Sequence, residues 1–362
     1  MAASTRICLA AVRRTSAPLP RFSAVAIRHI HISASQPASV APGLVSSAPP
    51  PPPTPQDSKG IRPNRRKRQI ELLRPPPGTQ SPRKRFWQTV SIQPVKDNAK
   101  FLEVRLDSRL LRHPTTKQPV LIPASKPLLA HALAVEWDQL LSVQEATKTH
   151  LIPLTSLVCR AVDIAADDAA GNEETRRAIV KVLLRYMDTD TILCLAPHAD
   201  PKDENSPYSY KNAEGKTMRE VQDEKFLEVV GPLTAKVWPG VKIVPVLGDD
   251  GHSIFPKKQE QGMREVVQGY LLGLSGWELA GVERATLAGK SLLTAVRLVE
   301  EWKEGGLGEG KFGVEEASKA VSVETDWQQA RWGEVEDTHD VEREDVRRQF
   351  GGVVLLVAGK GT

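Results

Sequence analysis

The chain has 362 residues, enough for one or two domains with a hydrophobic core, and a formal charge of +5. Residues 1–85 carry +13, from 15 Lys and Arg against two acids, and the remainder carries −8, from 34 basic and 42 acidic residues. A protein that binds nucleic acid needs a basic surface on its folded part, so this distribution argues against that class. We interpret the basic run at 65–68 as a solvated linker rather than a nuclear signal or an RNA-binding patch.

The first 56 residues contain no acid, and five arginines punctuate a stretch rich in Ala and Ser. This composition is typical of a mitochondrial transit peptide, which we expect over residues 1–37; the alternative is a disordered cytosolic tail. Residues 38–82 are rich in proline, which predicts a disordered linker. The longest apolar run of the leader is too short to cross a bilayer, so we expect a matrix protein without membrane insertion.

The three cysteines, Cys8, Cys159 and Cys194, are scattered along the chain. They do not form the spacing of a disulfide framework. Zinc binding by the last two with His198 and His252 would lack the close ligand pairs that such sites use. We therefore expect no metal.

Short strands follow the linker. Residues 86–92, 101–106, 110–112 and 120–123 read as strands separated by polar turns, which predicts an antiparallel β domain over 83–124. About 40 residues of sheet cannot bury a core alone, so this sheet must pack on a helix.

From residue 125 the pattern becomes helical. Ser125 is the predicted N-cap of a first helix, with Pro127 in its first turn. The fold class is therefore α+β, with a small β domain followed by a larger helical domain over 125–362. The further helices are expected at 155–166, 173–187, 226–238, 266–274, 277–302 and 314–331, and a terminal strand at 353–357. Thr189 or Asp190 is expected to cap a short element after the third helix.

The closest approach to a nucleotide motif is Ala288-Gly289-Lys290-Ser291. A phosphate-binding P-loop would need glycine at position 284, where Arg284 stands, and a preceding strand, where the pattern is helical. We interpret Gly289 as a close helix–helix contact and expect no cofactor. The alternative function is a matrix enzyme of unknown reaction that uses Asp188, Asp190, Asp249 and His252.

Residues 323–340 contain two tryptophans five residues apart and six carboxylates. On a helix, side chains five apart project about 140° apart, so both tryptophans cannot face one core. An exposed tryptophan among carboxylates is a candidate partner-binding site. Alternatively, Trp332 packs beneath a helix end at Gly333. The candidate residues for partner binding are Glu324, Asp326, Trp327, Gln328, Trp332, Glu334 and Glu336.

Several motifs occur in an order that resembles the Atp-twelve family, the assembly chaperones for the alpha subunit of the F1 sector of ATP synthase. They are FWQTV at 86–90, LDSRLL at 106–111, AVEWD at 134–138, PLTSL at 153–157, YMDTDT at 186–191, and the WQ and RWGEVE segments between 327 and 336. Ser108 stands where relatives usually have glycine, and Lys290 where they have a small polar residue.

The resemblance implies a non-enzymatic protein of the mitochondrial matrix without a cofactor. It implies a chaperone that holds the unassembled alpha subunit until the beta subunit joins the hexamer, and a small β domain before a larger helical one. It also implies that an acidic residue in the C-terminal region is functional, with Glu324, Asp326, Glu334 and Glu336 in the matching region. We expect a monomer; the rival within this reading is a permanent structural subunit.

Overall fold

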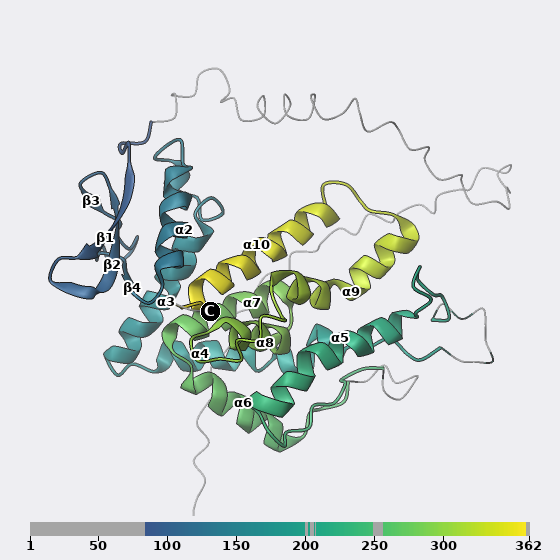
Figure 1. Cartoon of the computed structure of the whole chain (residues 1–362). Helices are drawn as coiled ribbons and strands as arrows, with labels where there is room; N and C mark the ends of the chain where they lie inside the picture. Colours follow the sequence, from purple (N-terminus) through teal and green to yellow (C-terminus); the bar gives the residue numbers. More distant parts are fainter. Residues whose placement is uncertain (1–83, 200–201, 203–205, 207, 249–255, 360–362) are drawn as a thin grey trace, which may run out of the picture. The chain divides into compact units, whose positions relative to one another are not determined.

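A computed structural model describes residues 84–199, 202, 206, 208–248 and 256–359. The predicted transit peptide and linker lie outside the described residues, and so do Asp249 and His252. A small antiparallel sheet comes first and a set of helices follows (Figure 1), which confirms the α+β fold class. The domain boundary at residue 124 stays a prediction.

The sheet is arranged around its longest strand. β2 (Asn98–Leu106) pairs antiparallel with β1 (Val90–Val95), β3 (Arg109–Leu110) and β4 (Leu121–Pro123). Alternate residues of β2 face inward, so that Val104 and Leu106 are buried. The sheet is thus apolar on one face, as its period-two pattern predicts.

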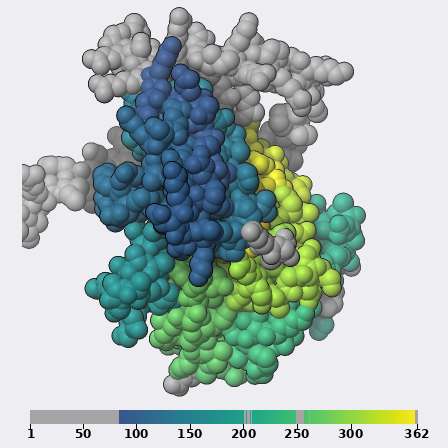
Figure 2. All heavy atoms as spheres, turned by 60° about the vertical axis from the view of Figure 1, so that its left-hand side comes forward, coloured from purple at the N-terminus to yellow at the C-terminus, as the bar shows by residue number. Residues whose placement is uncertain are grey.

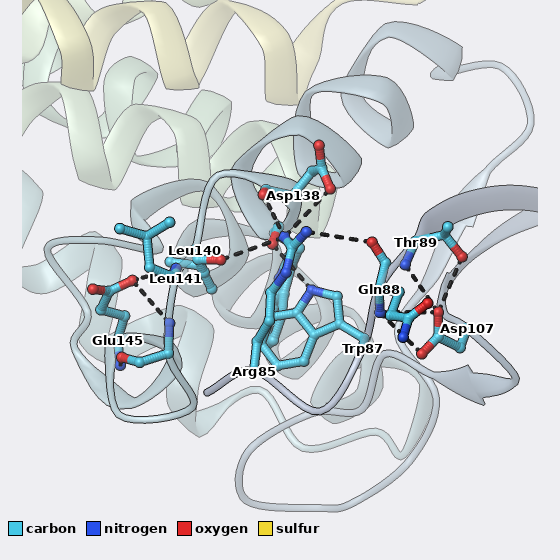
Figure 3. Close-up of polar contacts among 11 residues, drawn as sticks. Arg85, Trp87, Gln88, Thr89, Asp107, Asp138, Leu140, Leu141 and Glu145 are labelled. Atoms are coloured by element: carbon cyan, nitrogen blue, oxygen red, sulfur yellow. Dashed lines mark hydrogen bonds and ion pairs between the residues drawn. The ribbon is translucent and has the colours of Figure 1, made fainter. Parts of the chain in front are cut away.

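The first strand begins four residues later than predicted because residues 85–89 are held by side chains (Figure 3). The Asp107 carboxylate accepts hydrogen bonds from the backbone N–H groups of Gln88, at 3.1 Å, and Thr89, at 2.9 Å. These bonds, led by the one from Thr89, lower the pKa of Asp107. Asp107 itself takes the left-handed conformation of the turn, with φ 53°, so the next residue, Ser108, does not need the conformational freedom of glycine.

Helix α2 (Pro127–Asp138) covers the buried face of the sheet, which confirms that the sheet packs on a helix. The Trp87 and Trp137 rings lie 5.6 Å apart, and the Trp87 indole N–H donates to the Trp137 carbonyl. The predicted cap at Ser125 is wrong: Lys126 is the N-cap, and its ammonium group has no lone pair with which to accept a helix N–H.

The most buried helix is α8 (Leu292–Trp302), in which every residue from 292 to 301 is buried. The other helices are α3 (Pro153–Ala169), α4 (Glu174–Leu183), α5 (Met218–Pro232), α6 (Gln261–Gly273), α7 (Gly276–Gly289), α9 (Val314–Trp332) and α10 (His339–Val357), with short turns η1 (Glu145–Thr147), η2 (Tyr186–Asp188), η3 (Thr191–Leu193) and a π-helical turn η4 (Leu233–Val237). Of these helices, α5, α7, α9 and α10 pack against α8. In the space-filling view, the sheet and α2 in blue lie against these helices (Figure 2). Among the residues that the structure describes, no helix has the length and apolar character needed to cross a membrane.

Two element predictions are wrong. The helical region 277–302 is two helices, because Lys290 adopts φ 54° and the Ser291 hydroxyl accepts the N–H of Thr294 as a new N-cap. Residues 353–357 are the end of α10 rather than a strand. Their run of valine and leucine suits a strand locally, but Phe350, Val353 and Val357 recur at helical spacing and are buried together.

Gly289 is a helix–helix contact, as predicted. A Cβ atom there would lie 2.9 Å from Phe350 Cζ of α10 and 3.0 Å from Val321 Cγ1 of α9. The glycine lets α7 approach both helices closely and, as the last residue of α7, it lies directly before the α7–α8 break. The segment that resembles a P-loop is therefore a packing device.

Candidate functional site

A pocket of about 300 Å³ opens where α9 and α10 meet the 189–195 segment, α5 and the α7–α8 break. It brings together two family-like motifs that lie more than 130 residues apart in the sequence: YMDTDT and the C-terminal segment. Its charged or titratable lining residues are Cys194, Lys225, Lys290, Glu324, Asp326, His339, Glu342 and Arg343. We call this the α9–α10 pocket.

Asp190 anchors the wall of this pocket. Its side chain is completely buried, and its carboxylate accepts the N–H groups of Ile192 at 3.1 Å and Leu293 at 3.0 Å. It therefore caps η3, as predicted, and also the first turn of α8. Burial raises the pKa of Asp190 to about 6 in spite of these hydrogen bonds. The residue fixes the backbone of the pocket and presents no free group to a ligand.

Glu324 and Asp326 both line the pocket. The sequence alone did not separate these two acids from Glu334 and Glu336. Glu324 is exposed and accepts a hydrogen bond from Gln328 Nε2 at 3.1 Å. Asp326 is half-buried and accepts the Ser322 hydroxyl at 2.7 Å. Burial raises the pKa of the neighbouring Cys194 thiol, and the charges of Asp190 and Glu324 raise it further. The Cys194 thiol thus lies near two acidic side chains, those of Asp190 and Glu324.

The two tryptophans lie in different environments, as their spacing predicts. Trp327 is half-buried and packs edge to face on Tyr210, with ring centroids 5.9 Å apart. Trp332 is 72% exposed, so the alternative in which it packs beneath the helix end is wrong. The Arg331 guanidinium lies over both the Tyr210 ring, at 4.9 Å, and the Trp332 ring, at 5.5 Å. A cation between two aromatic rings holds this end of α9 in order.

The remaining candidates lie beyond the pocket, in the turn between α9 and α10. Glu334 forms a 3.0 Å ion pair with Arg343, which also donates to the Gln329 amide oxygen at 2.5 Å. Glu336 is exposed. Val335 is 56% exposed and Val341 is 57% exposed. With Trp332, these valines are the exposed large apolar residues of the segment 331–341, which we call the α9–α10 tip.

The structure thus divides the predicted residues into a pocket group, Glu324 and Asp326, and a group outside it. The latter comprises Trp327, Gln328, Trp332, Glu334 and Glu336. Sequence reasoning missed Tyr210, Arg331 and Arg343, which hold the site together. Tyr210 belongs to a loop whose sequence has no periodic pattern. Arg331 lies on the predicted helix, whereas Arg343 lies on α10, in a region for which no helix was predicted. Only the contacts in space identify them.

The residues proposed for the alternative enzyme do not form a described catalytic set. Asp188 pairs with Arg264 at 3.3 Å, while the carboxylate of Asp190 is enclosed and occupied by backbone N–H groups. Asp249 and His252 lie outside the described residues. Within the described part of the chain, no three His, Cys, Asp or Glu side chains are grouped closely enough to hold a metal ion.

Two solved structures have a similar fold. The crystal structure of Atp12 from Paracoccus denitrificans has a TM-score of 0.54, covering 76% of this chain and 97% of that one at 19% identity. That of Atu1473, described as a putative chaperone from Agrobacterium tumefaciens, has a TM-score of 0.51, covering 83% and 96% at 23% identity. These two likenesses define the fold.

Sequence comparison then gives the family. Residues 84–234 match the family described as ATP12 chaperone protein. The chain is 30% identical to the mitochondrial protein atp12 of Schizosaccharomyces pombe over 273 residues, which covers 75% of this chain and 81% of the relative. It is also 30% identical to mitochondrial ATP12 of Saccharomyces cerevisiae over 281 residues, covering 74% and 81%. The chain belongs to the ATP12 chaperone family.

Proposed function

We propose that this chain is a chaperone of the mitochondrial matrix that binds the unassembled alpha subunit of F1-ATPase. It holds that subunit until the beta subunit joins and so promotes assembly of the alpha/beta hexamer of ATP synthase. It acts as a monomer and catalyses no reaction. Family membership and the mitochondrial names of the relatives support this proposal. The arginine-rich, acid-free leader agrees with the compartment.

The observation that carries the proposal is the exposed Trp332 at the end of α9, the helix that also carries Glu324 and Asp326. A tryptophan that is 72% exposed contributes apolar area that its own chain does not bury. Tryptophan and arginine are the residues most enriched among those that dominate binding energy at protein interfaces, and Arg331 lies over this ring. The α9–α10 tip is therefore the proposed centre of the contact with the client.

The net charge of residues 86–362 gives the contact its direction. The three acids of the pocket lining are matched by three bases, but residues 86–362 as a whole carry −8. A negative surface attracts a basic client surface over distances of about 8–10 Å at physiological salt. Long-range attraction of this kind raises the rate of encounter more than the final affinity, which suits a chaperone that must later release its client.

The test is co-expression of the alpha subunit with the wild-type chain, with Glu324→Lys and with Glu265→Lys. Glu265 is an exposed acid of α6 outside the pocket, so its reversal is the matched control for net charge. Glu324→Lys is expected to lower the soluble fraction of the alpha subunit, whereas the control keeps it. Equal solubility with both variants would contradict the role of the pocket.

The identity of the client is tested separately, by capture from mitochondria depleted of the beta subunit. The alpha subunit should be the main protein retained by the wild-type chain. Recovery of the chain as a stoichiometric part of the mature ATP synthase would instead favour a structural subunit.

A further inference from the structure

A second surface lies between α2, α3 and α10, built from the AVEWD and PLTSL motifs that the α9–α10 tip does not use. It is a groove of about 630 Å³. Its apolar lining is Ala132, Val135, Leu151, Pro153, Leu154, Leu157 and Leu355, joined by Gly351 and Gly352; its charged or titratable lining is Glu136, His150, Arg284 and Arg348. We call it the α2–α10 groove.

Helix α2 is apolar on two sides. Leu129, Leu133 and Trp137 are buried on the side that meets the sheet. A second stripe on α2 is formed by Leu128, Ala132 and Val135, spaced by four and three residues, and its two larger members are 57% and 54% exposed. Ala132 and Val135 line the groove, and Leu128 lies one turn before them. A helix that is apolar on more than one side is normally buried on each of them. The groove side of α2 therefore lacks a partner within the described chain.

The opposite wall of the groove contains two adjacent glycines in the middle of α10. A glycine within a helix lowers stability by roughly 1 kcal/mol relative to alanine, so two adjacent glycines call for a structural reason. At Gly289 the reason is crowding, but a Cβ on Gly351 would meet nothing within 4 Å and one on Gly352 would meet only Leu157 Cδ2 at 3.9 Å. Packing inside the chain does not require glycine at either position. The pair keeps the groove open.

The charged groups of the groove select its occupant. Glu136 is already used, because its carboxylate accepts the N–H groups of Leu154 at 2.7 Å and Thr155 at 2.8 Å at the start of α3. Arg348 is paired with Asp345. Within the described chain the Arg284 side chain forms no hydrogen bond or ion pair, and its charge acts on Asp345 only at longer range. The guanidinium of Arg284 is thus available to a carboxylate from outside.

We propose that the α2–α10 groove is a second contact with the client, and that it takes a helical segment with an apolar stripe and one acidic side chain. An amphipathic helix laid between two helices is a recurring mode of recognition, with apolar anchors at helical spacing. The apolar anchors lie between the α2 stripe and the two glycines, and the acid pairs with Arg284. This inference rests on the proposed function.

Cross-linking from two positions separates the two proposals. Photoreactive p-benzoylphenylalanine replaces Val135, which lines the groove and is 54% exposed, or Trp332, at the α9–α10 tip, in the full chain co-expressed with the alpha subunit. Cross-links from both positions, with the Val135 site joined to an apolar client helix that carries an acid, are the expected result. Cross-links from Trp332 alone would overturn the groove and leave the proposed function standing. Cross-links from neither position would overturn both.

A filled groove gives the second test. Gly351→Leu places a side chain in the open space and removes a helix-destabilising glycine, so we expect an unchanged or higher Tm together with at least tenfold weaker binding of the purified alpha subunit. Gly269→Leu is the matched control, because Gly269 also lies within a helix, is exposed and has nothing within 4 Å of a Cβ. Equal binding by the two variants would overturn the groove as a contact. Arg284→Glu tests the acid, with weaker binding expected; full affinity would overturn its role.

Discussion

Replacing Trp332 with alanine is the sharpest test of the α9–α10 tip, because the side chain contributes little to the fold. It is 72% exposed, and its one ring contact is with Arg331. A surface cation–π contact is worth about 0.5–1 kcal/mol, so the free energy of unfolding should fall by less than about 1 kcal/mol. Any larger effect of Trp332→Ala must appear in the binding of the client.

The size of that effect follows from the exposed area. A tryptophan side chain buries about 150–250 Å² when enclosed, so its exposed 72% corresponds to roughly 110–180 Å². At about 25 cal/mol per Å² this is about 3–4.5 kcal/mol of apolar burial. Ordering of the side chain in the complex offsets part of it, which leaves about 2–3 kcal/mol, or about 30- to 150-fold in Kd.

The measurement is a titration of the purified alpha subunit with the wild-type chain, Trp332→Ala and Leu141→Ala. Leu141 is 78% exposed in the segment after α2 and lies outside both proposed surfaces, so it controls for loss of an exposed apolar side chain. Thermal unfolding of each variant shows that the fold is retained. A Kd for Trp332→Ala within twofold of the wild-type value, with unchanged Tm, would refute the reasoning.

Three further predictions concern the fold that supports the site. The folded pKa of Asp190 is raised to about 6 from 3.8, so the stability that its titration contributes is present at low pH and is lost as the pH rises through 6. Lowering the pH from 7 to 4.5 should therefore add about 2 kcal/mol from this residue to the free energy of unfolding. Asp190→Asn should lack this increment when denaturant unfolding is compared at the two pH values. Gly289→Val should lower the free energy of unfolding by about 1–3 kcal/mol through overpacking against Phe350 and Val321, and a Tm equal to that of the wild type would mean that the helices can move apart. Asp107→Ala should lower the Tm more than Asp107→Asn, since asparagine tolerates the left-handed turn and keeps an acceptor for the Thr89 N–H; the reverse order in thermal unfolding would contradict this.

The elements that the sequence predicted well are those whose pattern has one period and one buried face. β2 alternates with period two, and α9 ends at Gly333 as expected. The predictions failed where a local preference competed with a longer pattern. The valine and leucine run at 353–357 favours a strand when taken alone, but it continues the buried face of a helix that begins fourteen residues earlier, at His339. The break at Lys290 depends on one residue with φ 54°, which no periodicity reveals.

The candidate site was predictable only as a stretch of sequence. The motif around residues 323–340 indicated the right helix end, and the spacing of its tryptophans correctly required two environments. The pocket itself was not predictable, because its other wall is the 189–195 segment, which Asp190 holds through contacts with residues about a hundred positions away. The α2–α10 groove was missed for a similar reason: the glycines at 351 and 352 acquire meaning only when the empty space beside them is known.

Several buried or half-buried carboxylates of this chain support its fold. Asp190 and Glu136 each accept backbone N–H groups at a helix start, which commits both side chains to holding the backbone. Glu301 is buried against Arg297 and also accepts the Lys311 N–H. The acids that stay accessible, such as Glu324, lie at surfaces where water weakens each single interaction. A surface of this kind binds through many modest contacts, and a client held in this way can pass to a partner whose interface is larger.

On this reasoning Glu324→Gln, which removes the charge but keeps the contact with Gln328, should slow association with the alpha subunit and change its dissociation rate little. An effect confined to dissociation would contradict the electrostatic role.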